Sequence, residues 1–226
     1  MKVIPLQKWG KEKPYLKDPG SSELGQKIIQ HSIVMIDKMG FESFTFRKLA
    51  IKIHSTEATI YRYFENKHKL LIYLLSWYWN WLEYRLLTAT SNVSDPEERL
   101  KIALRVLSEP IEEDHDYQYI DETSLYRIVV AESHKVYLTK DVDKDNKEGL
   151  FLSYKRICKY VAAIIEEINP AYRFPTALVS TVVESSYDQR YFAQHLPSLT
   201  EVTRDHQRDV TEYLTEMVFR TISASK

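Results

Sequence analysis

The most informative segment of the sequence begins with GFESFTFRKLA over residues 40–50. Thr45 can cap a short helix, because its hydroxyl can accept a hydrogen bond from a free backbone N–H of the first turn. Leu49 and Ala50 form the apolar inner face of that helix. His54 follows in a tight turn. This part of the segment therefore predicts a short helix that ends in a turn.

The segment continues with TEATIYRYFENK over residues 56–67. Thr56 caps a third, very short helix, and Ile60 and Phe64 lie one turn apart on its buried side. The other side chains of this helix face outward. Two short helices joined by a tight turn, with another helix packed behind them, are the geometry of a helix-turn-helix domain that reads DNA.

The helix behind this pair is predicted immediately upstream. It begins near Ser22, carries apolar residues at helical spacing and ends at Gly40. Downstream, Asn66 caps a long fourth helix. We therefore expect a three-helix DNA-binding domain over residues 22–68, preceded by a flexible basic arm over residues 1–21, where prolines prevent a long helix.

The remainder of the chain, residues 69–226, is predicted to be a helical-bundle domain for ligand binding and dimerisation. Only five glycines and eight prolines occur in the sequence, which favours helices over a many-stranded β fold. Charged loops are expected at 109–116 and 139–149. The helices expected from the fourth onward are 66–88, 96–108, 119–137, 149–168, 174–195 and 200–222. The fold class is therefore all-α, with nine or ten helices.

The net charge of −1 conceals an uneven distribution of charge. Residues 1–70 hold 13 Lys and Arg against 7 Asp and Glu, whereas the remainder holds 18 against 25. A basic N-terminal segment followed by an acidic remainder suggests that the N-terminal segment binds a polyanion. No apolar run is long enough to span a membrane, and the N-terminus lacks the apolar core of a signal peptide. With Cys158 as its one cysteine, the composition predicts a soluble, cytoplasmic protein.

Residues 40–50 and 56–67 resemble the TetR family of bacterial regulators. In that family a glycine-aromatic connector leads into a short helix with a Leu/Ile-Ala pair. A Tyr-x-x-Phe recognition helix follows, and a lysine then opens the long linker helix. The resemblance covers residues 24–72, and beyond them it extends only to the architecture. It implies that the chain binds a double-stranded DNA operator.

The resemblance also implies which residues contact DNA. Glu57, Ala58 and Thr59 would reach base edges in the major groove. Arg47 would reach the groove from the second helix, and Lys67 would grip a phosphate together with the N-terminal amides of the fourth helix. The predicted DNA-binding residues are Thr45, Arg47, Thr56, Glu57, Ala58, Thr59, Tyr61, Arg62, Tyr63 and Lys67.

Alternatives stay open for several of these residues. Tyr61 and Tyr63 could pack against the first helix, and Arg62 could be a solvated charge. Glu57 could accept from a cytosine or cap its helix, because carboxylates repel phosphate. His54 stands where the family usually has a glycine with positive φ, which histidine tolerates better than most residues. The arm could follow DNA, but we favour disorder; its lysines are Lys2, Lys8, Lys11, Lys13 and Lys17.

Aromatic side chains in the long helices suggest a pocket for a small apolar or amphipathic effector. Trp77 and Trp81 share one face of the fourth helix, although ordinary core packing is the simpler reading of each residue alone. Polar groups on other helices could orient the ligand. The candidate pocket residues are Trp77, Trp81, Tyr126, His134, Tyr154 and Tyr187.

A homodimer is expected, because one short recognition helix reads too few bases and a two-fold dimer doubles the site into a partly palindromic operator. In the TetR architecture the last two helices form the interface. Apolar stripes on them give the candidate interface residues Leu178, Val182, Val210, Leu214, Met217 and Val218.

Catalytic residues, cofactors, metals and a membrane partner are not expected. The run from Asp141 to Asn146 begins like a calcium loop but lacks its glycine, and Leu152 replaces the bidentate glutamate. Cys158 lies on an apolar helix, where a buried inert thiol is expected. The sequence therefore predicts a regulator, most simply a repressor released by its effector; control by a partner protein is the alternative.

Overall fold

The computed structural model describes residues 13–111, 119–203 and 208–223. All regular structure within this part of the chain is helical, which confirms the all-α prediction. None of the described helices is long and apolar enough to cross a membrane.

The structure divides into two compact units. The first comprises Met1–Asn80 with Ile111–Ser153, and the second comprises Trp81–Pro110 with Tyr154–Lys226. Helices α4 (Lys67–Thr90) and α9 (Leu152–Ile168) each contribute residues to both units. The domain boundary expected after residue 68 stays a prediction.

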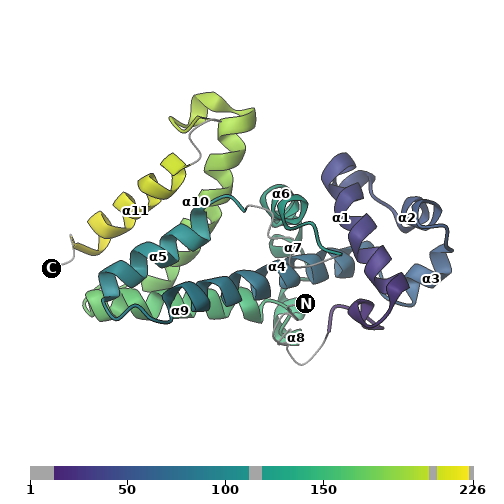
Figure 1. The fold of residues 1–226 in the computed structure, drawn as a ribbon, viewed down its shortest axis with the longest axis horizontal. Helices are drawn as coiled ribbons and strands as arrows, with labels where there is room; N and C mark the ends of the chain where they lie inside the picture. The colour runs from purple at the N-terminus through teal and green to yellow at the C-terminus, as the bar shows by residue number, and fades with distance from the viewer. Residues whose placement is uncertain (1–12, 112–118, 204–207, 224–226) are drawn as a thin grey trace. The chain divides into compact units, whose positions relative to one another are not determined.

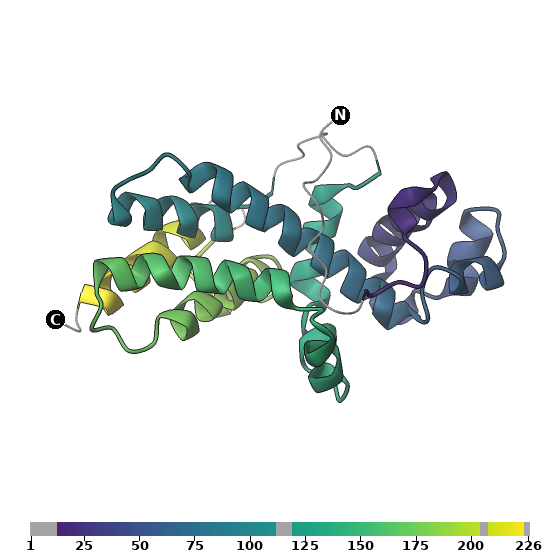
Figure 2. The same ribbon diagram turned by 90° about the horizontal axis from the view of Figure 1, so that it is seen from below.

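The first unit contains the helix-turn-helix segment. Its elements are η1 (Pro19–Ser21), α1 (Glu23–Ser43), α2 (Phe46–Lys52), α3 (Glu57–Tyr61), α6 (Glu122–Glu132), α7 (His134–Tyr137) and α8 (Val142–Glu148). Helices α1, α2 and α3 lie together in both views (Figures 1 and 2). Helix α6 packs against α1.

The predicted helix starts are confirmed by their capping hydrogen bonds. The side-chain oxygens of Ser22, Thr45 and Thr56 each accept a backbone N–H three residues later, at 3.2 Å. Asn66 Oδ1 accepts the Lys69 N–H at 2.9 Å in the same way. Each cap satisfies a backbone donor that the first turn leaves unpaired.

The end of the first helix predicted at Gly40 is instead a break within α1, which continues to Ser43, with φ 74° and ψ 157° at Gly40. This φ lies in the region that residues with a Cβ rarely adopt. The chain beyond it turns inward, so that Phe41 and Phe44 are buried. The break therefore seats the connector between α1 and α2 in the core.

The second unit is a helical bundle. Besides parts of α4 and α9, it contains α5 (Pro96–Ser108), α10 (Pro175–His195), η2 (Pro197–Leu199) and α11 (Arg208–Ser223). Helices α5, α10 and α11 pack against one another in pairs. Asp95 caps α5 by accepting the Glu98 N–H at 2.9 Å.

Three helix predictions need correction. The charged stretch 139–149, expected to be a loop, contains α8, which ends at Gly149 with φ 84°. The helix expected over 119–137 is two helices, α6 and α7. Within the described residues the last helix begins at Arg208, not near 200, and residues 204–207 of the predicted helix lie outside them.

The helix count is also higher than expected. The described residues form eleven α-helices and two 3₁₀ helices, against the nine or ten predicted. Helix α8 was not expected, because its sequence is mostly charged and carries no apolar stripe. Its buried Asp145 instead pairs with Lys69, which lies far away in the sequence. Hydrophobic periodicity does not detect polar helices that are stabilised by tertiary contacts.

Candidate DNA-binding interface

The interface is built on the α2–turn–α3 unit. His54 occupies the turn with φ 53°, the positive value expected for this position. The Ser55 N–H donates to the Ala50 carbonyl at 2.9 Å, which closes the turn. Ile60 and Phe64 are fully buried against the domain core, as predicted. These contacts fix α3 relative to α2 and leave its other face outward.

The outward face of α3 carries small and polar side chains. Ala58 is exposed. Thr59 Oγ1 lies 2.8 Å from Thr56 Oγ1 and accepts from Arg62 Nη2 at 3.4 Å. Glu57 lies in the first turn, where the helix dipole favours a carboxylate. This narrow surface is one that a major groove can admit.

The two tyrosines of α3 and its C-terminal end have different surroundings. Tyr61 is 46% exposed and packs edge-on against Phe46 at 5.1 Å between ring centroids. Tyr63 is buried, and its hydroxyl lies 2.8 Å from Ser22 Oγ at the start of α1. Tyr63 therefore takes the packing alternative, whereas Tyr61 keeps an accessible ring.

Positive charges surround the Tyr63 hydroxyl. Burial by itself raises the pKa of Tyr63, but the hydrogen bonds from Ser22 and Lys17 and the charges of Lys17 and Arg62 outweigh it and lower the pKa. Lys17 Nζ lies 5.0 Å from the centre of the Tyr63 ring. The C-terminal end of α3 therefore carries two cations.

Lys67 is held by backbone carbonyls. Its Nζ donates to the Phe41, Glu42 and Phe44 carbonyls at 3.0, 3.2 and 3.4 Å. It also lies 4.6 Å from the centre of the Phe41 ring. This ammonium therefore closes the end of α1 against the start of α4, a role the sequence resemblance did not indicate.

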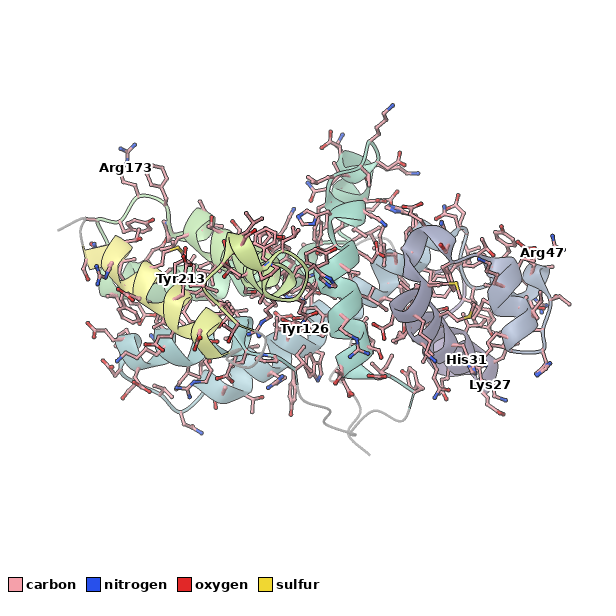
Figure 3. The ribbon with its side chains drawn as sticks, turned by 90° about the horizontal axis from the view of Figure 1, so that it is seen from above. Lys27, His31, Arg47, Tyr126, Arg173 and Tyr213 are labelled. Carbon is pink, nitrogen blue, oxygen red and sulfur yellow. The ribbon has the colours of Figure 1, made fainter. Side chains whose placement is uncertain are left out.

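Other cations lie on the exposed surface of α1 and α2. Arg47 is exposed at the edge of the three-helix group, on the side away from α1 (Figure 3). Lys27 and His31 lie on α1 in the same view. Burial and the charges of Lys52 and Lys27 lower the pKa of His31. Burial is the larger cause of this lowering, and the two lysine charges add to it.

Residues 13–21 of the predicted N-terminal arm lie against the domain, and the flexibility expected over residues 1–21 stays a prediction. The Leu16 N–H donates to the Tyr63 carbonyl at 2.7 Å, and the Tyr15 ring lies edge-on to Tyr73. Pro14 and Pro19 are buried. Residues 1–12, with Lys2, Lys8 and Lys11, lie outside the described residues.

The candidate effector residues have varied surroundings. In the first unit, Trp77 is buried, Tyr126 is half-buried with its ring 6.4 Å from that of Tyr78, and His134 is exposed. In the second unit, Trp81 and Tyr187 are buried, and Tyr154 donates to Glu184 at 3.0 Å. Their role toward a ligand remains a prediction.

Most of the apolar residues predicted to form the dimer interface are buried within a single chain. Leu178 is 8% exposed, and Val182, Val210, Leu214 and Val218 are fully buried; Met217 alone of the six is half-buried. They are buried because α5, α10 and α11 pack against one another. These five side chains are core residues of the second unit and offer no surface to a second copy.

Cys158 is buried as expected. Burial, with the nearby Glu184 carboxylate, raises the pKa of its thiol to about 11. The thiol therefore stays protonated near neutral pH and is a poor nucleophile.

Comparisons with known proteins agree with this geometry. Residues 28–74 match the sequence model described as "Bacterial regulatory proteins, tetR family". No curated protein matches the chain.

Three solved structures share its fold. A structure of superantigen PfiT is 14% identical with a TM-score of 0.59, covering 89% of this chain and 97% of that one. A structure of AibR in complex with isovaleryl coenzyme A and operator DNA is also 14% identical, with a TM-score of 0.56 over 84% and 95% of the two chains. A structure of the ketosteroid transcriptional regulator KstR2 of Mycobacterium tuberculosis is 14% identical, with a TM-score of 0.53, and covers 88% of this chain and 93% of that one.

The capped α2–turn–α3 unit, its basic surroundings and the match over residues 28–74 define a helix-turn-helix DNA-binding protein. Residues 28–74 form a DNA-binding domain of the type found in the tetR family of bacterial regulatory proteins.

Proposed function

We propose that this protein is a cytoplasmic repressor that binds a partly palindromic operator as a homodimer and releases it when a small molecule binds. The observation that carries the proposal is the fixed presentation of α3, with its apolar side anchored by Ile60 and Phe64 and its polar side accessible. A single such helix spans only a few base pairs, so two copies are needed for a specific site.

The proposed DNA contacts fall into two groups. Ala58, Thr59 and Tyr61 would reach base edges or flanking phosphates, because they lie on the accessible side of α3. Thr45, Arg47, Thr56, Glu57 and Arg62 would complete the surface, while Lys67 and Tyr63 would position α3 from behind.

The proposed effector is a small apolar or amphipathic molecule. The structurally similar AibR was solved with isovaleryl coenzyme A and KstR2 is named for ketosteroids, both of which have apolar parts. In this chain, the aromatic groups of the first unit would take up such a part. There Tyr78 packs edge-on against Trp79, whose Nε1 donates to Tyr137 at 2.7 Å.

Polar links between α6 and α1 offer a route from the effector to the DNA. Arg127 donates two hydrogen bonds to the Asp37 carboxylate, at 2.8 and 2.7 Å. The Phe41 N–H donates to Glu132 Oε1 at 2.9 Å. A ligand that displaces α6 would move α1 through these bonds. A full switch requires about 5.5 kcal/mol of difference in ligand affinity between the two states.

Selection of duplexes from a random pool by the full-length protein tests this proposal. We expect an enriched inverted repeat and binding that weakens steeply with salt. Thr59→Ala should blur the base preference, whereas Lys144→Ala, an exposed change on α8, should leave it intact. Recovery of no inverted repeat would contradict the operator proposal.

A screen of acyl thioesters and sterols tests the effector. Release of the selected duplex, accompanied by a change in tryptophan fluorescence, is expected for an active compound. A release that requires a protein from the native extract, with every small molecule inactive, would favour the alternative of control by a partner protein.

A further inference from the structure

The segment that joins the N-terminal arm to α1 lies directly at the end of the recognition helix. We name residues 13–21 the strap. Leu16 donates its N–H to the Tyr63 carbonyl at 2.7 Å, in the turn that follows α3. Two buried prolines, Pro14 and Pro19, flank this bond. The strap is therefore attached to the same turn that ends α3.

Two side-chain contacts fix the strap further. Tyr63 bonds with Ser22 Oγ at 2.8 Å, next to the last strap residue. The Lys17 ammonium lies 5.0 Å from the Tyr63 ring. Because Tyr63 is buried and Lys17 is exposed, the cation lies against an anchored ring at the protein surface. A cation held this way loses less conformational entropy on binding an anion.

Two exposed cations, Arg62 and Lys17, stand at this end of α3, where Glu65 is the exposed carboxylate of the following turn. Arg62 is exposed, and its charge acts on Tyr63 together with that of Lys17. The nearest acid of the strap, Asp18, turns its Oδ1 toward the Gly20 N–H at 2.9 Å as a local cap. Glu23, at the start of α1, pairs with Lys27 at 2.7 Å. Asp18 and Glu23 therefore already have partners.

The positions of Lys17 and Arg62 suit a contact with the DNA backbone at one edge of the major groove. A helix lying in the major groove, about 12 Å wide, has the sugar-phosphate backbones near its two ends. Thr45 and Arg47 belong to the element before the N-terminal end of α3, whereas Lys17 and Arg62 stand at its C-terminal end. Each end of α3 thus has its own set of groups for one backbone.

We propose that the strap is a second DNA-binding element, in which Lys17, supported by Tyr63 and flanked by Arg62, binds a backbone phosphate at the C-terminal end of α3. The inference rests on the proposed operator binding and adds a contact that lies outside the helix-turn-helix. The ligand is the phosphodiester of duplex DNA. The contact positions α3 without reading bases.

The test measures affinity against salt for Lys17→Gln, on an approximately 30-bp duplex selected by the wild-type protein. Each lost phosphate contact lowers the slope of log K against log salt by about 0.9, so a dimer should lose about 1.8. Between 50 and 200 mM salt, that makes the fall in affinity roughly tenfold smaller than in the wild type. Lys17→Arg should keep the wild-type slope.

Lys38→Gln is the matched control, because it removes the same charge from the exposed surface of α1, about 24 Å from Ser22 at 1.5 Å per residue. Its slope should equal that of the wild type. An unchanged slope for Lys17→Gln would overturn the inference, and so would an equal loss in both variants. Failure of the wild-type protein to bind any selected duplex would instead contradict the proposed function.

Discussion

Lys67 and Tyr63 stand at positions where the family resemblance implies DNA contacts. Lys67 instead donates to three carbonyls, and Tyr63 bonds with Ser22. Both residues hold α3 and α4 in place relative to α1. Their contribution to DNA binding would therefore come from positioning α3.

Lys67→Met tests this distinction. The change keeps an apolar stem but removes the donor to three carbonyls, so we expect a loss of about 2 kcal/mol in the free energy of unfolding. DNA affinity should fall because α3 is less well positioned, while the salt dependence of binding stays as in the wild type. Urea unfolding and salt titrations measure the two effects. A slope lower by about 0.9 per protomer would show that Lys67 binds a phosphate after all.

At the scale of elements, α1 depends on α6 for its C-terminal end. The chain leaves helical geometry at Gly40, which frees the next N–H, that of Phe41, and Glu132 of α6 accepts it at 2.9 Å. The Glu132 side chain is 9% exposed, so water has little access to this site and the carboxylate takes its place as the hydrogen-bond acceptor. A break in one helix is thus satisfied by a side chain about ninety residues away.

Glu132→Ala should destabilise the protein by about 2 kcal/mol, because a buried N–H loses its acceptor. Glu132→Gln is the matched control, since its amide oxygen can still accept that bond. It loses only the ion pair with Lys135, which is partly exposed and contributes little. Hydrogen exchange at the Phe41 amide should speed up in the alanine variant alone. Equal exchange rates in both variants would contradict the proposed link.

A second link joins α8 to the first turn of α4. Lys69 Nζ lies 2.7 Å from Asp145 and 3.1 Å from Glu148, and Asp145 is almost fully buried. Burial alone lowers the pKa of Lys69, but the bonds to these two carboxylates outweigh it and raise the pKa. The pair therefore keeps α8 against the helix that follows the recognition domain.

Lys69→Met should cost about 3 kcal/mol in the free energy of unfolding at pH 7, because it leaves a buried carboxylate without its main partner. A raised folded-state pKa means that the lysine stabilises the fold fully below its unfolded pKa of about 10.4. The contribution is lost as the pH rises through the higher folded-state value. The difference between wild type and variant should therefore shrink above about pH 10.4. A difference that stays constant up to pH 11 would contradict this account.

At the scale of the whole molecule, the dimer must use surface that one chain leaves free. The stripes first expected to pair are filled by α5, α10 and α11 within one chain. On α11, Tyr213 is 50% exposed and Met217 is half-buried one turn later (Figure 3). On α10, Tyr191 is 41% exposed. We expect these exposed side chains of α10 and α11 to contact the symmetry mate.

Tyr213→Glu should convert the dimer into monomers and abolish operator binding, because the charge would be buried at the interface. Its thermal unfolding should remain cooperative, since the residue is exposed in the single chain. Leu214→Glu, one residue along, should instead unfold the second unit. Lys159→Glu, on the exposed surface of α9, is the control that stays dimeric. Sedimentation of Tyr213→Glu as an unaltered dimer would place the interface elsewhere.

The local features of this protein could be predicted from the sequence. The caps at Ser22, Thr45, Thr56 and Asn66, the break at Gly40 and the burial of Ile60 and Phe64 depend on neighbours within a few residues, so spacing and residue type were sufficient. The helix-turn-helix, and with it the class of protein, was predictable for the same reason.

The remaining features could not be predicted in this way, because they depend on partners far along the chain. The bond of Leu16 to Tyr63, the carbonyls around Lys67 and the pairing of α8 through Asp145 each join segments more than 20 residues apart. The apolar stripes of α10 and α11 were visible in the sequence, but periodicity shows only that a face is buried. Whether a neighbouring helix or a second copy buries it depends on how the chain packs, and here α5 does.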